Sequence, residues 1–366
     1  MMKKTILYVV VVLFTLSCGN DDGVNVEEPA LLPVEEGRSL QISNLYDYQI
    51  EVNQAAHVAV LNNLVTQSLA FEANVTETEL VALQNAWKTA FLNWKSNEVF
   101  NLGAIQSSFI HTRINQWPTN DEAIEENIAG EETLNSDFVS SVGANTKGYS
   151  AIEYLLFHDT NAVVLAELTT AEHAERRMQY LLGLIENLAE QAAFLQTFWE
   201  GVEPSFKSNL ETGVNGSQNQ VVNAIIASLE SMKGTKIEEA LNAETDAVTY
   251  FEAYRSRTSK EALIVNLNTL YNSYLGEYEG QSGFGLEDYI LEVLNRPEID
   301  TALQEAFVVA MSDLEAMDGA IEDVLLSDVT ALETLRTDLQ TIIGLLKTDL
   351  SSAANIVVTF NDTDGA

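Results

Sequence analysis

The stretch MQYLLGLIENLAEQAAFLQTFW, residues 178–199, decides the fold class. Its apolar residues recur at intervals of three and four, which places them on one face of an α-helix. They are Met178, Leu181, Leu182, Ile185, Leu188, Ala189, Ala192, Leu195 and Trp199. Such a long apolar stripe must be covered by other elements, so we expect a protein built from packed helices.

The same spacing returns in four segments after residue 215. Their apolar residues begin at Val221, Leu263, Leu303 and Leu332. The last segment, with Leu332, Leu335, Leu339, Ile342 and Leu346, alternates three and four strictly, as bundle seams do. No comparable run alternates with a period of two, so we predict four long helices in an up-down bundle.

The first half of the chain predicts helices at about 38–73, 77–100, 148–157 and 170–203. The prolines lie at plausible boundaries of these segments. We therefore predict an all-α fold with two tandem, four-helix-bundle-like domains, residues 36–212 and 213–366. The irregular acidic stretch from Gln116 to Lys147 is too long for a simple turn, so it is either a functional connection or a disordered or merely decorative insertion.

The first residues predict export and lipid attachment. Lys3 and Lys4 precede a short apolar run, from Ile6 to Leu16, which ends at Ser17 and Cys18. The run is shorter than the ~20 residues that span a bilayer, so a membrane helix is the weaker interpretation. We expect a signal peptide at 1–17, a lipid on Cys18 and a flexible acidic tether at 18–35.

The amino-acid composition excludes several classes of partner and cofactor. Cys18 is the only cysteine, so an intramolecular disulfide and a cysteine-based metal site are both excluded. The formal net charge is −37, and loss of Lys3 and Lys4 would make it −39. Such a field repels nucleic acid and anionic lipid surfaces, so we expect no nucleic-acid partner. Acidic side chains also attract cations, but most of them are expected simply to be solvated.

The segment GYSAIEYLLF, residues 148–157, resembles the signature helix of the imelysin family, whose motif is Gly-x-His-x-x-Glu followed by Tyr-Leu-Leu. Further resembling pieces follow in the family's order and together cover about residues 40–366. They are Trp87 and Trp94, Asn101 to Gly103, Ile114 to Pro118, Arg177 to Leu182, Leu184 to Trp199, Gly283 to Leu286, and Thr359 to Gly365.

The chain departs from this motif at one position, because Ser150 stands where the family has histidine, while Glu153 matches its glutamate. Positions three apart share a helix face, so the family's pair could hold a transition metal together. A serine hydroxyl is a poor ligand by comparison. Glu153 therefore remains the one candidate metal ligand in this helix, for iron or another divalent metal.

Other residues complete the candidate binding site. The resemblance places His111, Arg113 and Trp117 near the signature helix, and Asp362 and Asp364 in a terminal segment that can fold back onto the bundles. Asp362 and Asp364 do not begin an EF-hand, because the chain lacks the later glutamate. Alternatively, Glu153 pairs with a buried arginine: Arg113, Arg177 or Arg255.

The resemblance implies a cell-envelope protein connected with iron or haem uptake, on the periplasmic or surface face of the outer membrane. Because of Ser150, we favour a non-catalytic binding protein for a metal, a metal chelate or a partner from the uptake system. Two alternatives stay open: a metallopeptidase that uses Glu153 and more distant carboxylates, and a structural or adaptor lipoprotein without a small ligand. No residues mark a Ser-His-Asp triad or a His-Glu-x-x-His motif.

Overall fold

The computed structural model describes residues 30–278 and 280–359. Cys18, Asp362 and Asp364 lie outside the described residues, so the lipid anchor and the terminal site residues stay predictions. In the described part of the chain, no helix has the length and apolar character needed to cross a membrane.

The long helices of the first half begin and end close to the predicted positions. Helix α1 (Val34–Leu45) continues through a π-helical turn (Tyr46–Ile50) into α2 (Glu51–Ala73), and α3 spans Glu77–Glu98. The signature helix is α8 (Gly148–Phe157), and the longest helix, α10, spans Ala174–Ser208. The all-α prediction is confirmed.

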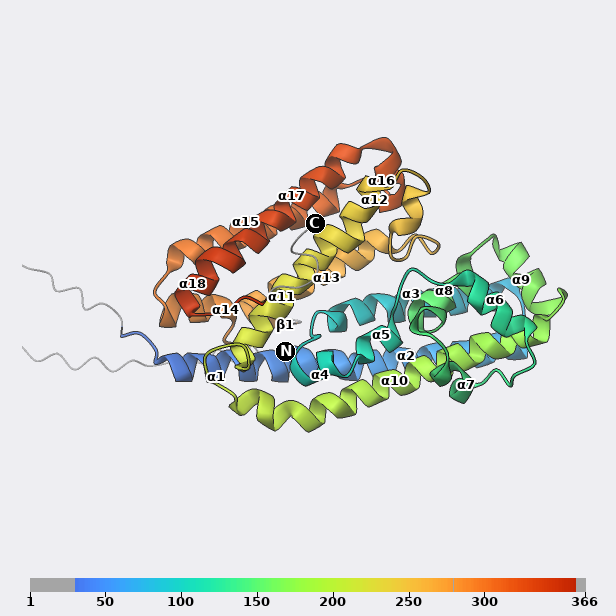
Figure 1. Ribbon diagram of the computed structural model, residues 1–366, viewed down its shortest axis with the longest axis horizontal. Helices are drawn as coiled ribbons and strands as arrows, with labels where there is room; N and C mark the ends of the chain where they lie inside the picture. Colours follow the sequence, from blue (N-terminus) through green and yellow to red (C-terminus); the bar gives the residue numbers. More distant parts are fainter. Residues whose placement is uncertain (1–29, 279, 360–366) are drawn as a thin grey trace, which may run out of the picture. The chain divides into compact units, whose positions relative to one another are not determined.

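The core of this half lies between α2, α3 and α10, which run alongside one another (Figure 1). Seven residues of the predicted α10 stripe are buried: Met178, Leu181, Ile185, Leu188, Ala192, Leu195 and Trp199. Each large apolar side chain removed from water stabilises the fold by about 1.5–3 kcal/mol. The stripe therefore fixes which face of α10 points inward.

The stretch from Gln116 to Lys147 folds into short helices, so it is not disordered, and the functional and the merely decorative interpretations both stay open. It contains α6 (Asp121–Ala129), α7 (Ser136–Ser141) and a 3₁₀ turn at Ala144–Thr146. Asn120 and Asn135 cap α6 and α7, each accepting a hydrogen bond from the main-chain N–H three residues later. Three further short helices flank the stretch: α4 (Gly103–Ser107), α5 (Ile110–Ile114) and α9 (Asn161–Thr169).

The second half contains the four predicted long helices, α11 (Ser217–Lys233), α13 (Ser259–Leu275), α15 (Pro297–Ala316) and α17 (Val329–Leu345). Helix α17 packs on α11 and α15, and α13 also packs on both. Shorter elements connect them: a π-helical turn (Gly234–Glu238), α12 (Glu239–Asn242), a 3₁₀ turn (Ala247–Tyr250), α14 (Leu286–Asp288), a π-helical turn (Tyr289–Val293), α16 (Ile321–Ser327), a π-helical turn (Leu346–Leu350) and α18 (Ser351–Ala354).

A two-stranded antiparallel hairpin follows α13, with β1 at Glu277–Tyr278 and β2 at Gln281–Ser282. Helices from the two halves also contact each other, α3 with α13 and α1 with α11. The described residues from Leu31 onward group as one compact unit by their contacts. The predicted domain boundary at residues 212 and 213 therefore stays a prediction, although the two sets of helices divide near it.

Candidate functional site

The signature helix α8 begins against the segment that follows α5. Gly148 has a φ of +72° and forms an isolated antiparallel bridge with Asn115. A Cβ atom at Gly148 would overlap the main-chain oxygen of Ile114. Glycine is therefore required here both for the positive φ and for the close approach of this residue to the segment that follows α5.

Ser150 fastens the first turn of α8 to the same segment. It is buried, and its Oγ donates a hydrogen bond of 2.6 Å to the main-chain oxygen of Gln116. The hydroxyl that replaces the family's histidine is thus already engaged as a donor. It stabilises the local packing of α8 through this contact.

Glu153, one turn further along α8, is only 1% exposed. Its Oε1 accepts a hydrogen bond of 2.8 Å from the main-chain N–H of Ser256. Burial raises the pKa of Glu153 to about 7, although the hydrogen bonds from Ser256 and the charge of Arg255 act in the opposite direction. The carboxyl group therefore titrates near neutral pH.

The expected arginine partner of Glu153 is not found among the described residues. Arg177 pairs with Glu125 at 2.5 Å, and Arg255 pairs with Asp121 at 2.6 Å. Arg113 is exposed. In the described part of the chain Glu153 makes no ion pair, so the prediction of an arginine partner is wrong and a main-chain amide takes that place.

His111, on α5, lies beside Trp94, with the two ring centroids 4.8 Å apart in an edge-to-face arrangement. Both side chains are buried, and neither His111 Nε2 nor Trp94 Nε1 has a hydrogen-bond partner among the described residues. Burial, assisted by the charge of Lys95, lowers the pKa of His111 to about 3. The imidazole is therefore neutral at physiological pH.

His57, by contrast, has a hydrogen-bond partner within the core. It is completely buried on α2, and its Nε2 lies 2.8 Å from the hydroxyl of Tyr149. Tyr149 donates in turn to the main-chain oxygen of Ala90. Burial and the nearby His111 lower the pKa of His57 to about 3, so this histidine is also neutral.

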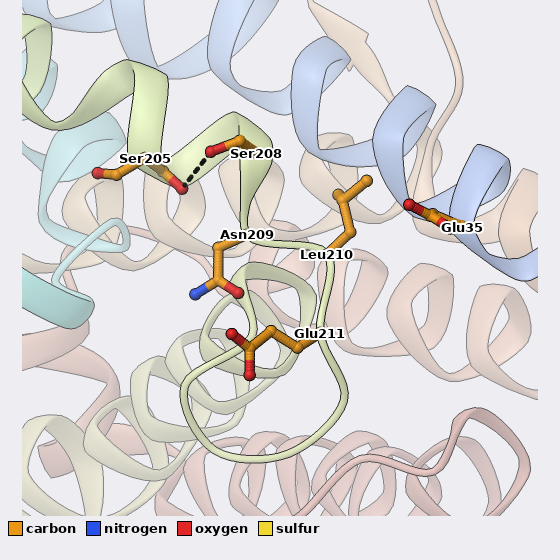
Figure 2. A pocket seen from close by; sticks show the side chains of 6 residues that line it. All are labelled: Glu35, Ser205, Ser208, Asn209, Leu210 and Glu211. Atoms are coloured by element: carbon orange, nitrogen blue, oxygen red, sulfur yellow. Dashed lines mark hydrogen bonds between the residues drawn. The ribbon is translucent and has the colours of Figure 1, made fainter.

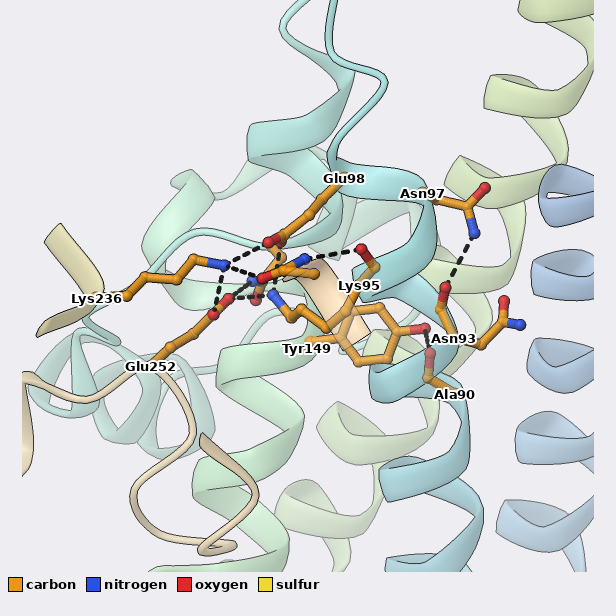
Figure 3. A network of polar contacts seen from close by, with 10 residues as sticks. Ala90, Asn93, Lys95, Asn97, Glu98, Tyr149, Lys236 and Glu252 are labelled. Carbon is orange, nitrogen blue, oxygen red and sulfur yellow. Dashed lines mark hydrogen bonds and ion pairs between the residues drawn. The ribbon is translucent and has the colours of Figure 1, made fainter. Parts of the chain in front are cut away.

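Four charged side chains form a buried ion network that joins the two halves (Figure 3). Lys95 and Glu98, from α3, lie 2.6 Å apart, and Lys236 lies 3.1 Å from Glu252, which belongs to the loop before α13. The pairs also cross, because Lys95 contacts Glu252 and Lys236 contacts Glu98. Burial tends to raise the pKa of Glu98, but the ammonium groups of Lys236 and Lys95 lower it to about 2.

The ion network forms one wall of a cleft of about 240 Å³ between the two halves. Its lining residues come from both halves: Trp94, Glu98, Asn101, Gln106, His111, Asn115 and Trp117 from the first, and Ala224, Ala227, Ser228, Ser231, Lys236, Glu252 and Asn266 from the second. Among the predicted site residues, His111 and Trp117 line this cleft. Ser150, Glu153 and Arg113 do not.

The ion network and much of the cleft wall have no signature in the amino-acid sequence. Lys95 and Glu98 are spaced like any surface pair on a helix, and Lys236 and Glu252 have no motif around them. Of the cleft residues, His111 and Trp117 were predicted as site residues, and Trp94, Asn101 and Asn115 fall in segments that resemble the family. The others come together only in the folded chain, where Lys236 meets Glu98 across a sequence separation of 138 residues and Lys95 meets Glu252 across one of 157.

A larger hollow, of about 630 Å³, lies at the end of α10 (Figure 2). It is lined by Glu35, Ser205, Ser208, Asn209, Leu210 and Glu211. Four of these six residues, Glu35, Ser205, Ser208 and Glu211, are exposed. The cleft beside the ion network, with its buried aromatic and charged walls, is therefore the stronger candidate site.

The residues at the signature helix do not fit a transition-metal ion. Ser150 uses its hydroxyl to bind Gln116, and Glu153 directs an oxygen to Ser256. Within residues 30–278 and 280–359, no group of three histidine, aspartate or glutamate side chains is placed to hold a metal. Protein sites for such ions ordinarily supply at least three ligands. Glu153 as a metal ligand stays a prediction without a supporting geometry.

The fold and the cleft define an all-α protein with a ligand-sized hollow between two groups of helices. The sequence model of the family described as imelysin matches residues 50–348, and the chain belongs to this family. The predicted resemblance to this family is thereby confirmed. A comparison with curated proteins finds no match.

Two solved structures share the fold. One is an imelysin-like protein from Psychrobacter arcticum, with a TM-score of 0.72 and 18% identity over 90% of this chain and 99% of that chain. The other is described as a putative iron-regulated protein A precursor from Parabacteroides distasonis, with a TM-score of 0.71 and 16% identity over 87% of this chain and 97% of that chain. At these identities the likeness shows the fold alone.

Proposed function

We propose that this chain is a non-catalytic binding protein of the bacterial cell envelope that acts in iron acquisition, with the cleft beside the ion network as its ligand site. The observation that carries the proposal is the pair of buried, unpartnered ring nitrogens, His111 Nε2 and Trp94 Nε1, in the wall of this cleft. Buried polar groups normally have a partner, so both are poised to bind a ligand or a bound water.

The link with iron rests on the family and on the name of one structural neighbour, an iron-regulated protein A precursor. The predicted lipid on Cys18 would hold the protein at the outer membrane, near an uptake system with which it could associate. A binding role also agrees with the chemistry of α8. Ser150 and Glu153 are both committed to hydrogen bonds with main-chain groups.

The cleft favours a small, hydrophilic iron chelate as the ligand. Its volume of about 240 Å³ lies below the ~300–1,000 Å³ of pockets that enclose drug-sized ligands, so haem is too large for it. The neutral His111, the indole N–H of Trp94 and the amides of Asn101 and Gln106 suit oxygen atoms of a chelate. A bare ion would lack a sufficient set of ligands in the described part of the chain.

Calorimetric titration of the full-length protein tests this proposal. Ferric citrate serves as the small chelate, and ferrous, ferric and zinc ions and haem are titrated separately. We expect saturable binding of the chelate near one equivalent, which His111→Phe abolishes because it removes Nε2. His173→Phe is the matched control, since the His173 side chain, at the start of α10, is 41% exposed and does not line the cleft.

Three results would contradict the proposal. The first is that the folded protein releases no heat with any of these ligands. The second is that the two histidine variants bind ferric citrate equally well. The third is cleavage of an unstructured protein substrate that a chelator stops, which would support the metallopeptidase alternative. If the protein neither binds nor cleaves but co-purifies with another envelope protein, the adaptor alternative is supported instead.

A further inference from the structure

We infer that Glu153 is a positioning residue: it holds the loop 251–258 against α8 and thereby sets the place of Glu252 in the ion network. The loop connects the 3₁₀ turn at Ala247–Tyr250 with α13. Glu153 thus influences the cleft without lining it. The inference stands on the geometry of the loop and does not require the cleft to bind an iron chelate.

The contact between Glu153 and the loop is buried on both sides. Glu153 is 1% exposed and Ser256 is 4% exposed, and the carboxylate Oε1 lies 2.8 Å from the main-chain nitrogen of Ser256. The neighbouring loop residues Phe251 and Ala253 are buried as well. An amide in this environment is shielded from bulk solvent, so loss of Glu153 removes its hydrogen-bond acceptor.

Hydrogen bonds within the loop carry this restraint from Ser256 towards Glu252. The hydroxyl of Ser256 donates to the main-chain oxygen of Ala253 at 3.1 Å. The main-chain N–H of Thr258 donates to the same oxygen at 3.2 Å. Ala253 adjoins Glu252, so fixing Ser256 also fixes the main chain from which the Glu252 side chain extends.

Glu252 is the residue through which the loop reaches the other half of the chain. Its carboxylate contacts Lys95 of α3 and Lys236, and it accepts a hydrogen bond of 2.6 Å from the amide of Asn115. Asn115 is the residue that bridges Gly148 at the start of α8. Helix α8 therefore meets the loop region twice, through Asn115 near its first residue and through Glu153 in its second turn.

Hydrogen exchange of the loop amides tests the inference, with tryptic cleavage after Arg255 and Arg257 as a second measurement. Glu153→Ala should speed exchange at the Ser256 amide by about 10- to 100-fold, because a buried hydrogen bond to a carboxylate is lost. Glu153→Gln should stay within about threefold of the wild type, because the amide oxygen of glutamine can still accept from Ser256.

The matched control is Asp300→Ala, which truncates another buried carboxylate. Asp300 lies on α15 and accepts a hydrogen bond of 2.6 Å from the hydroxyl of Tyr274. This variant should destabilise the protein without selectively exposing the loop 251–258. If Glu153→Ala changes loop exchange and cleavage no more than Asp300→Ala does, the positioning role is refuted.

A double-mutant cycle separates positioning from a general loss of packing. If Glu153 acts through Glu252, the increases in the unfolding constant caused by Glu153→Ala and Glu252→Gln should be less than multiplicative in the double variant. Independent, multiplicative effects would overturn the inference. So would zinc or iron protecting the wild-type loop while Glu153→Gln loses that protection, since this pattern belongs to a metal ligand.

Discussion

Glu153→Gln should make the protein more stable at alkaline pH while leaving its stability at acidic pH nearly unchanged. Burial raises the pKa of Glu153 in the folded protein to about 7, from an ordinary value of 4.5. The folded state therefore holds a proton more tightly than the unfolded state does. As the pH rises from 4.5 to 7, this difference lowers the free energy of unfolding, and above pH 7 the loss is complete.

The size of the effect follows from the shift in pKa. A difference of about 2.5 units corresponds to about 3 kcal/mol, at ~1.36 kcal/mol per unit. Glutamine cannot ionise, so it avoids the cost of a buried charge while its oxygen still accepts from Ser256. Part of this difference already applies at pH 5, so the stability of Glu153→Gln relative to the wild type should increase by about 2–3 kcal/mol between pH 5 and pH 8.

Urea unfolding at constant ionic strength, followed by tryptophan fluorescence, measures this difference at pH 5, 6, 7 and 8. Glu172→Gln is the control for a change in net charge, because the Glu172 side chain is 91% exposed. The reasoning is refuted if the difference between Glu153→Gln and the wild type is independent of pH, or if it decreases as the pH rises.

Four further substitutions give distinct expected results. Gly148→Ala should lower the free energy of unfolding by about 3 kcal/mol or more, measured in urea, because it combines a positive φ with an overlap against a main-chain oxygen. Lys236→Ala should cost about 3–5 kcal/mol in the same assay, because it leaves two buried carboxylates with one ammonium group. His111→Asn should make the protein less sensitive to acid. Because the pKa of His111 is lowered in the folded state, the wild type loses stability below pH 6.5, by about 3 kcal/mol at pH 4.5. Urea unfolding of both proteins at pH 7 and at pH 4.5 measures this difference. Ser150→His should cost about 1–3 kcal/mol by overpacking a buried position, and thermal unfolding with and without zinc should show no metal-dependent stabilisation.

The long helices could be predicted because their information is local. The apolar stripe of α10 and the strict spacing of α17 need only the period of the helix, and both stripes are buried as expected. Helices α6 and α7 escaped prediction because nine and six residues provide too few turns to establish a period. Their Asn120 and Asn135 caps are the signal that could have revealed them.

The candidate site was predicted only in part, through segments outside the signature motif that resemble the family. The resemblance placed His111 and Trp117 near the signature helix, and the structure shows both in the wall of the cleft. Glu153 is buried as expected, but its partner is a main-chain amide, which has no side-chain signature in the sequence. The ion network was out of reach for a related reason, because pairing between distant lysines and glutamates depends on how the helices pack.

The composition of the ion network has a consequence for chimeric proteins. Each half contributes one lysine and one glutamate, so neither face carries a net charge from these four residues. Exchanging one half for that of a relative would therefore preserve the charge balance whenever the relative also supplies one of each. It would preserve the crossed ion pairs only when the lysine and the glutamate of the relative occupy equivalent positions. Grafting experiments should thus transfer Lys95 together with Glu98, or Lys236 together with Glu252.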